Sequence, residues 1–182
     1  ELFPIDIHIS KVSIAGETHF AAFIRDMSER ENHERALHQT LYYDTLTGLP
    51  NEFSLRWYLD NYFTDAESDP VNLLICSLDR MESLNATFGL ERGNQLLRVA
   101  AQHIGSTFAG APFVARLRGQ HFAIVSREDP EALKRKIHSL GSAVSRSFAA
   151  EMALPHARLL STFSCGCLSL PALAKTTDDA LK

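Results

Sequence analysis

The clearest apolar segment of the chain is the uninterrupted run Val71–Leu78. Such a run is typical of a central strand that is buried on both faces of a sheet. Two shorter apolar runs, at 114–117 and 122–125, flank Arg118 and Gly119, and this spacing predicts a β-hairpin with a two-residue turn. Gly supplies a positive φ at such a tip, whereas a left-handed Arg118 would cost roughly 1–2 kcal/mol.

Helical periodicity surrounds these strands. It predicts helices over 52–63, 80–88, 92–107 and 130–148, with an apolar strand at 158–170 and a further helix start at 177–179. The resulting order is helix, strand, helix, helix, hairpin, helix, strand. This order predicts an α+β fold, an α/β sandwich in which helices cover a mixed sheet.

The N-terminal part has a different pattern. Residues 3–12 and 18–24 alternate apolar and polar side chains, which predicts a hairpin that turns near residues 15–17. Because two strands alone are marginal in water, we expect this hairpin to end a domain that starts before residue 1. The polar helix predicted after it, to about residue 44, is either a solvated spacer or one half of a parallel two-helix dimer.

The composition and charge of the chain are those of a globular protein that binds neither nucleic acid nor a membrane. The chain has 182 residues, 45% hydrophobic and 22% charged, which suits one globular domain with an appendage. A net charge of −4 provides no basic field for nucleic acid or an anionic membrane. No apolar stretch approaches the length of about 18 residues that a membrane helix needs, and no signal-peptide pattern precedes the hairpin. We therefore expect neither nucleic acid nor direct membrane contact.

The three cysteines have no disulfide or zinc spacing. Cys165 and Cys167 alternate along an apolar segment, so both point to one face of the predicted strand, and we expect them to be buried thiols. Free thiols are typical of a reducing compartment, which predicts the cytoplasm.

Four motifs occur in order along the chain. They read DTLTGLPN from residue 44, SLDRMESLNATFGL from residue 77, GNQLL from residue 93 and RLRGQHF from residue 116. In this order they resemble the GGDEF family, the cyclases that condense two GTP molecules into cyclic di-GMP. The resemblance covers about 42–182. It implies a nucleotidyl-cyclase-like sheet, mainly antiparallel and flanked by helices, in a domain at 45–182 whose C-terminal end is incomplete.

The resemblance also shows where this chain departs from the family. The family holds Mg²⁺ with an Asp and an acidic residue at the positions of Ser77 and Gln120, and the next acidic position is His121. Magnesium prefers anionic oxygen ligands, which these side chains do not offer. The glycine that lets phosphates approach is replaced by Arg118. We expect no catalytic residues here, and Asp79 is the one weak candidate for a metal ligand.

Nucleotide binding is a separate question. Asn85 and Asn94 stand where the family reads guanine with Asn and Asp, and Arg118 with Gly119 could attract a phosphate. The alternative role for Asn85 is that of a cap or turn residue. No cofactor is expected unless residual nucleotide binding persists, in which case GTP and Mg²⁺ are the candidates.

The N-terminal segment resembles the end of a PAS sensor domain. Residues 1–26 correspond to its last two strands, and 27–44 to a signalling helix. The favoured function is a catalytically degenerate GGDEF domain that acts as a regulatory or dimerisation module, with a homodimer through helix 28–44. The alternatives are an active diguanylate cyclase and a scaffold that needs no nucleotide. We expect the chain to be part of a longer protein, which could carry an EAL phosphodiesterase domain.

Overall fold

The computed structural model describes residues 3–14, 17–65, 69–151 and 162–181. The chain divides into two compact units, Glu1–Leu41 and Tyr42–Lys182. No helix within the described ranges is both long enough and apolar enough to cross a membrane.

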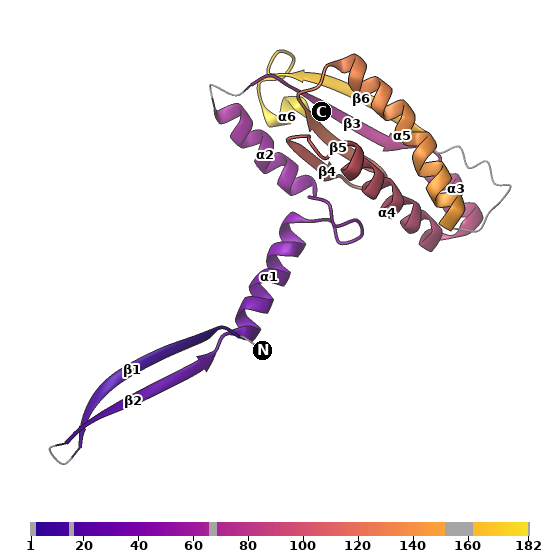
Figure 1. The fold of residues 1–182 in the computed structure, drawn as a ribbon. Helices are drawn as coiled ribbons and strands as arrows, with labels where there is room; N and C mark the ends of the chain where they lie inside the picture. Colours follow the sequence, from indigo (N-terminus) through magenta and orange to yellow (C-terminus); the bar gives the residue numbers. More distant parts are fainter. Residues whose placement is uncertain (1–2, 15–16, 66–68, 152–161, 182) are drawn as a thin grey trace. The chain divides into compact units, whose positions relative to one another are not determined.

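A four-stranded sheet forms the centre of the second unit (Figure 1). Its order is β4 (Phe113–Arg116), β5 (His121–Ser126), β3 (Val71–Leu78) and β6 (Phe163–Leu170), and every pairing is antiparallel. The apolar run predicted as a central strand is β3, which pairs on both sides. The strand predicted at 158–170 is described from Phe163, and residues 158–161 lie outside the described part.

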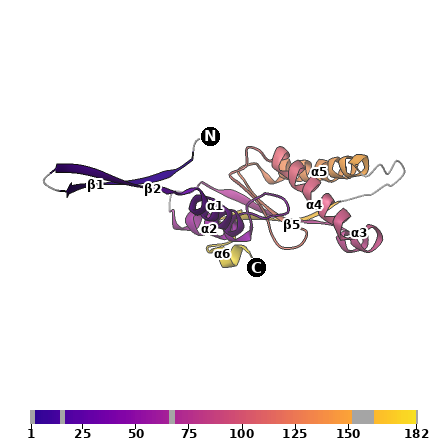
Figure 2. The same cartoon turned by 90° about the horizontal axis from the view of Figure 1, so that it is seen from below.

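Helices cover both faces of this sheet, as Figures 1 and 2 show, and the α+β class is confirmed. The helices are α2 (Glu52–Thr64), α3 (Met81–Phe88), α4 (Leu90–Thr107), α5 (Pro130–Glu151) and α6 (Thr177–Ala180). Alternation along β3 separates two cores. Leu74, Cys76 and Leu78 pack with α3, α4 and α5, whereas Val71 and Leu73 pack with α2 and α6.

The hairpin between β4 and β5 is wider than the predicted two-residue turn. Pairing ends at Arg116–Phe122, and the Leu117 N–H donates to the His121 carbonyl at 2.8 Å. Residues 118–120 therefore form the connection, and only Gly119, with φ 65°, has a positive φ. The longer turn lets Arg118 keep a negative φ, so the strain considered for a left-handed arginine does not arise.

The prediction that Cys165 and Cys167 are buried is wrong, because both thiols are exposed. Alternation does place them on one face of β6, but β6 is the last strand in the order of the described sheet. A cavity of about 910 Å³ opens between this strand and α5. Of the three cysteines, only Cys76 on the central strand is buried.

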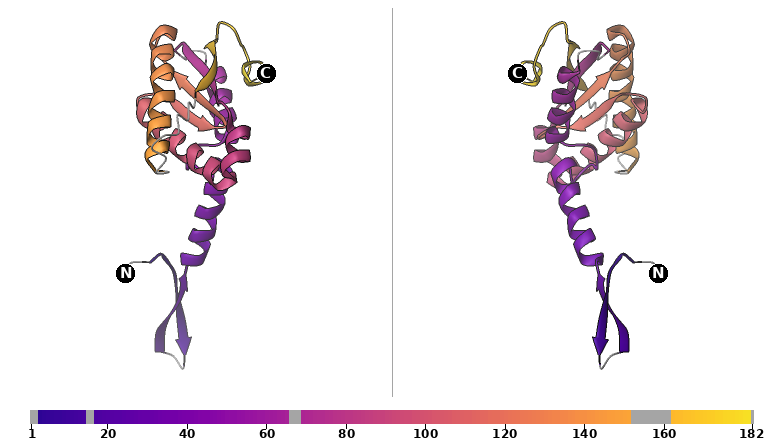
Figure 3. Two further views of the ribbon diagram at one scale, coloured as in Figure 1. Left: turned by 90° about the vertical axis from the view of Figure 1, so that its right-hand side faces the viewer. Right: turned by 90° about the vertical axis from the view of Figure 1, so that its left-hand side faces the viewer.

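The first unit contains the predicted hairpin, formed by β1 (Ile5–Ile14) and β2 (Glu17–Asp26), and the helix α1 (Ser28–Tyr42) that follows (Figure 3). The predicted turn residues 15 and 16 lie outside the described ranges. The Ser28 N–H donates to Asp26 Oδ1 at 2.8 Å at the start of α1. No residue of α1 is buried, as its polar sequence predicts.

Candidate functional site

The turn that connects β4 and β5 is held by Arg116, a side chain that is only 9% exposed. One terminal nitrogen donates to Asp44 Oδ1 at 2.7 Å, and the other donates to the Gly119 carbonyl at 2.7 Å. Its Nε is buried and has no hydrogen-bond partner among the described residues. Arg116 thus joins the loop before α2 to the tip of the hairpin.

Asp44 is the other half of this connection. It accepts hydrogen bonds from the Thr47 N–H at 2.9 Å and the Thr47 hydroxyl at 2.6 Å. Burial raises its pKa, but the hydrogen bonds from Thr47 and Arg116 and the Arg116 charge outweigh burial and hold that pKa below 3.8. Two of the four sequence motifs, which begin at Asp44 and Arg116, therefore form one ionised, hydrogen-bonded unit.

Ser77 and Gln120 come together at the end of β3. Gln120 Nε2 donates to the Ser77 hydroxyl at 3.5 Å, and His121 pairs with Ser77 across the two strands. The contact between these two residues, which the sequence resemblance places at the family's metal positions, is therefore a long hydrogen bond between neutral groups. His121 itself is exposed.

Asp79 is the acidic residue closest in sequence to Ser77, and its carboxylate already accepts hydrogen bonds from the start of β6 and from the residue before it. Its Oδ2 accepts a hydrogen bond from the Thr162 hydroxyl at 2.5 Å, and its Oδ1 accepts one from the Ser164 hydroxyl at 2.8 Å. Both oxygens are thus engaged.

These side chains do not fit a magnesium ion. Mg²⁺ requires hard oxygen ligands in near-octahedral geometry and is usually bound through one or two carboxylates. Ser77 and Gln120 contribute no charge, and Asp79 is oriented by two hydroxyl donors. Within the described ranges no group of three or more acidic, His or Cys side chains could hold a metal ion.

Asn85 lies in the middle of α3, so it is not the cap residue considered from the sequence. Its Oδ1 is buried without a hydrogen-bond partner in the described structure. Gly93 of α4 lies against it: a Cβ built at Gly93 would be 1.8 Å from that oxygen. Asn94, the second predicted guanine-reading residue, follows Gly93 and is half-buried.

Arg118 and Gly119 form the exposed tip of the hairpin. The Arg118 side chain is 95% exposed, and its Nε lies 3.6 Å from Glu52 Oε2 at the start of α2. Both residues border a cavity of about 430 Å³ that Asp44 and Phe53 also line. A Cβ at Gly119 would meet no atom within 4 Å, so the tip is open to solvent.

The predicted site residues therefore lie in separate groups rather than in one cluster. Ser77, Gln120 and His121 meet at the end of β3, whereas the contacts of Asp79 are with β6. The sequence reasoning missed the role of Ser164, since the β3–β6 register that places it opposite Ser77 is a long-range pairing. It also missed the contact between Gly93 and Asn85, although both motifs had been identified.

The sequence comparisons identify a family and several relatives. Residues 41–182 match the family described as diguanylate cyclase, GGDEF domain. The uncharacterized protein Mb1389c of Mycobacterium bovis is 36% identical over 83 residues, which is 46% of this chain and 13% of that protein. Cyclic di-GMP phosphodiesterase NbdA of Pseudomonas aeruginosa is 24% identical over 160 residues, which is 86% of this chain and 20% of that protein. The chain therefore spans only a small part of these relatives.

A solved structure shows the same fold. The coiled coil and GGDEF domain of DgcB from Caulobacter crescentus, crystallised with c-di-GMP, superposes with a TM-score of 0.62. The two chains are 24% identical, and the match covers 78% of this chain and 75% of that one. The family match and the shared fold together establish that this chain belongs to the GGDEF family.

Proposed function

We propose that residues 42–182 form a GGDEF domain that binds guanine nucleotide without turnover and acts as a regulatory module in cyclic di-GMP signalling. The observation that carries this proposal is the neutral contact between Ser77 and Gln120, 3.5 Å apart at the position of the family's metal ligands. Phosphoryl transfer depends on metal ions that neutralise developing charge and orient the reacting oxygens. Without an anionic ligand pair, that stabilisation is lost.

The buried oxygen of Asn85 supports retained nucleotide binding. A buried acceptor without a partner costs about 1–3 kcal/mol, so its persistence in the fold favours a ligand that donates to it. Guanine presents N–H donors on one edge. Gly93 leaves the space that keeps Asn85 in place, and Asn94 is adjacent to it.

The proposed function is tested by restoring the two carboxylates. We expect the unmodified chain, incubated with GTP and Mg²⁺, to make no more cyclic di-GMP than the matched Gly119→Pro variant. The double variant Ser77→Asp with Gln120→Glu should bind GTP more tightly with Mg²⁺ than without it, since two anionic ligands then face one ion.

One result would contradict the proposal. Cyclic di-GMP production by the unmodified chain, unchanged when Ser77 and Gln120 are replaced, would identify an active cyclase with other ligands.

The first unit suggests how the module is assembled. We propose that it is the end of a PAS sensor domain and a signalling helix, and that α1 pairs with a second copy of the chain in the cytoplasm. Leu37 and Leu41, four residues apart, are 70% and 47% exposed on this helix. Because the relatives are much longer, we also propose that the full protein carries further domains, an EAL phosphodiesterase among them.

A further inference from the structure

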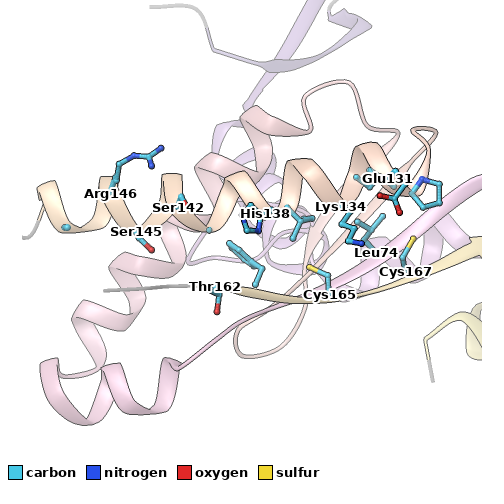
Figure 4. A pocket seen from close by; sticks show the side chains of 16 residues that line it. Leu74, Glu131, Lys134, His138, Ser142, Ser145, Arg146, Thr162, Cys165 and Cys167 are labelled. Atoms are coloured by element: carbon cyan, nitrogen blue, oxygen red, sulfur yellow. The ribbon is translucent and has the colours of Figure 1, made fainter. Parts of the chain in front are cut away.

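A large cavity lies on the face of the sheet opposite α2, between α5 and β6 (Figure 4). It has a volume of about 910 Å³. Leu74, Cys165 and Cys167 line it from the sheet, and Lys134 and His138 line it from α5. Figure 4 shows both sulfur atoms on the side of β6 that faces the helix. The cavity therefore gives small molecules access to two thiols.

A third thiol lies directly beside one of these. Cys76 on β3 and Cys165 on β6 are register partners, and in an antiparallel pair opposite residues share a face. The hydrogen bonds of the ladder define the type of pair. The Asp79 N–H donates to the Thr162 carbonyl at 2.9 Å, which marks a hydrogen-bonded position. Along an antiparallel ladder, hydrogen-bonded and non-hydrogen-bonded pairs alternate. The Cys76–Cys165 pair lies three positions before Asp79–Thr162 and is therefore a non-hydrogen-bonded pair.

Non-hydrogen-bonded pairs are the closer kind. Their Cα atoms lie about 4.5 Å apart, within the range of about 4.4–6.8 Å that disulfides span. Cys167 has no such partner, because it lies opposite Leu74. Cys165 and Cys167 are two residues apart on one strand, or about 6.7 Å along it, which is too far for the Cβ separation of about 4 Å that a disulfide needs.

We propose that Cys76 and Cys165 form a modification site, in which a hydroperoxide entering the cavity converts the two thiols into a cross-strand disulfide. The Cys165 sulfur attacks the peroxide, whose O–O bond breaks. Cys165 becomes a sulfenic acid, and its proton leaves with the departing oxygen as water or an alcohol. The Cys76 sulfur then displaces hydroxide from the sulfenic acid, and the Cys76 proton completes a second molecule of water. Two thiols are oxidised and one peroxide is reduced.

The two cysteines are suited to different steps. Cys165 is exposed to the cavity, whereas Cys76 is fully buried and lies opposite Cys165. A hydrogen bond from Cys76 lowers the pKa of the Cys165 thiol, against the opposing effect of burial, and the thiolate is the nucleophilic form. The same hydrogen bond and burial raise the pKa of Cys76. Cys165 therefore reacts first and Cys76 resolves the intermediate.

The modification site borders the candidate nucleotide site. Cys76 directly precedes Ser77, and Cys165 directly follows Ser164, which donates to Asp79. A covalent link between β3 and β6 at this level would fix the two strand ends that carry these residues. The strand register and the cavity bring the two thiols together whether or not a nucleotide binds.

The test is mild oxidation of the full chain with hydrogen peroxide, followed by peptide mapping without reductant. We expect a linked pair of peptides containing Cys76 and Cys165, lighter by two hydrogen atoms than the separate peptides and released by dithiothreitol. Cys167→Ser is the matched control, since it removes a thiol from the same strand face and should leave the link intact. Cys165→Ser, at an exposed position that tolerates the change, should abolish it.

Other products would overturn the proposal. One is oxidation of Cys165 to a sulfinic acid while Cys76 stays reduced. Another is a link that includes Cys167 or joins two chains. A further variant, Cys76→Ala, separates the two steps: it should leave a sulfenic acid at Cys165 that dimedone traps, and failure to trap it at that residue would contradict the assigned order.

Discussion

At the scale of single residues, Gly93 lies where even a small side chain would collide with Asn85. An added Cβ at Gly93 would lie 1.8 Å from Asn85 Oδ1 and 3.0 Å from its Cγ. The atoms in the way belong to a short side chain that can rotate, not to backbone. Replacement of Gly93 should therefore displace the Asn85 amide and leave the fold intact.

We predict that Gly93→Ala weakens GTP binding about tenfold, because displacement of Asn85 removes a buried hydrogen-bond acceptor worth about 1–3 kcal/mol. Calorimetric titration measures this loss. Gly105→Ala is the matched control on the same helix, since a Cβ there meets no atom within 4 Å. It should stabilise α4 by roughly 0.5–1 kcal/mol and leave GTP affinity unchanged. Equal GTP affinities in the two variants would exclude Asn85 from the site.

A second residue-scale prediction concerns Asp44, whose pKa is held below its usual value by Thr47 and Arg116 despite partial burial. A carboxyl with a depressed pKa stabilises the fold fully above its unfolded pKa of about 3.9, and the contribution disappears as pH falls through the folded pKa. We predict that Asp44→Asn lowers the free energy of unfolding by about 2 kcal/mol at pH 7, and by progressively less below pH of about 4.

Urea unfolding at several pH values measures that difference. Asp69→Asn is the control, because its pairing with Arg127 at 3.8 Å joins two exposed side chains and contributes at most about 1 kcal/mol. A deficit in Asp44→Asn that stays constant down to pH 2 would contradict the ionised pairing with Arg116.

At the scale of elements, the sequence predicted each strand and helix of the second unit because each has a strong pattern. The uninterrupted run Val71–Leu78 required a strand covered on both faces, and the structure places β3 between two neighbours. The errors concern burial, which depends on the elements that pack around a strand in the folded chain. Alternation placed Cys165 and Cys167 on one face, but only the sheet order reveals that β6 is the last described strand and that α5 leaves its surface open.

The candidate site was predictable to a similar degree. Motifs identified Ser77, Gln120 and Asn85, because those positions have fixed spacing within the GGDEF pattern. The partners of Asp79 were not predictable, since Thr162 and Ser164 lie more than 80 residues away along the chain and reach Asp79 only through the β3–β6 register. Local patterns do not contain such a register, which depends on how whole strands align.

The helix α1 gives the element-scale prediction. An isolated helix of 15 residues is marginal in water, and α1 buries none of its side chains. We predict that replacing both Leu37 and Leu41 by Glu shifts the chain from dimer to monomer. The two negative charges on one helix would then face the same two charges on the partner helix. Sedimentation equilibrium measures the change. Gln39→Glu, on the opposite side of the helix, should leave the dimer intact, and a monomeric unmodified chain would refute the pairing.

At the scale of the whole molecule, the chain has the GGDEF fold, and we propose that it lacks the charges of the family's metal site. The Asp44–Arg116 pair holds the signature hairpin in place, so the scaffold around the site is intact. Ser77 and Gln120, which the family resemblance places at the metal positions, are neutral. Among the described residues, the buried amide oxygen of Asn85 on α3 has no hydrogen-bond donor. On this combination rests our proposal of a domain that senses guanine nucleotide and does not consume it.

The most direct test of that account is calorimetric titration of GTP into the chain, once with Mg²⁺ and once with a chelator, followed by analysis of the mixture for cyclic di-GMP. We predict the same dissociation constant under both conditions and no cyclic di-GMP. The absence of any binding heat, or binding that requires Mg²⁺ and yields cyclic di-GMP, would contradict it.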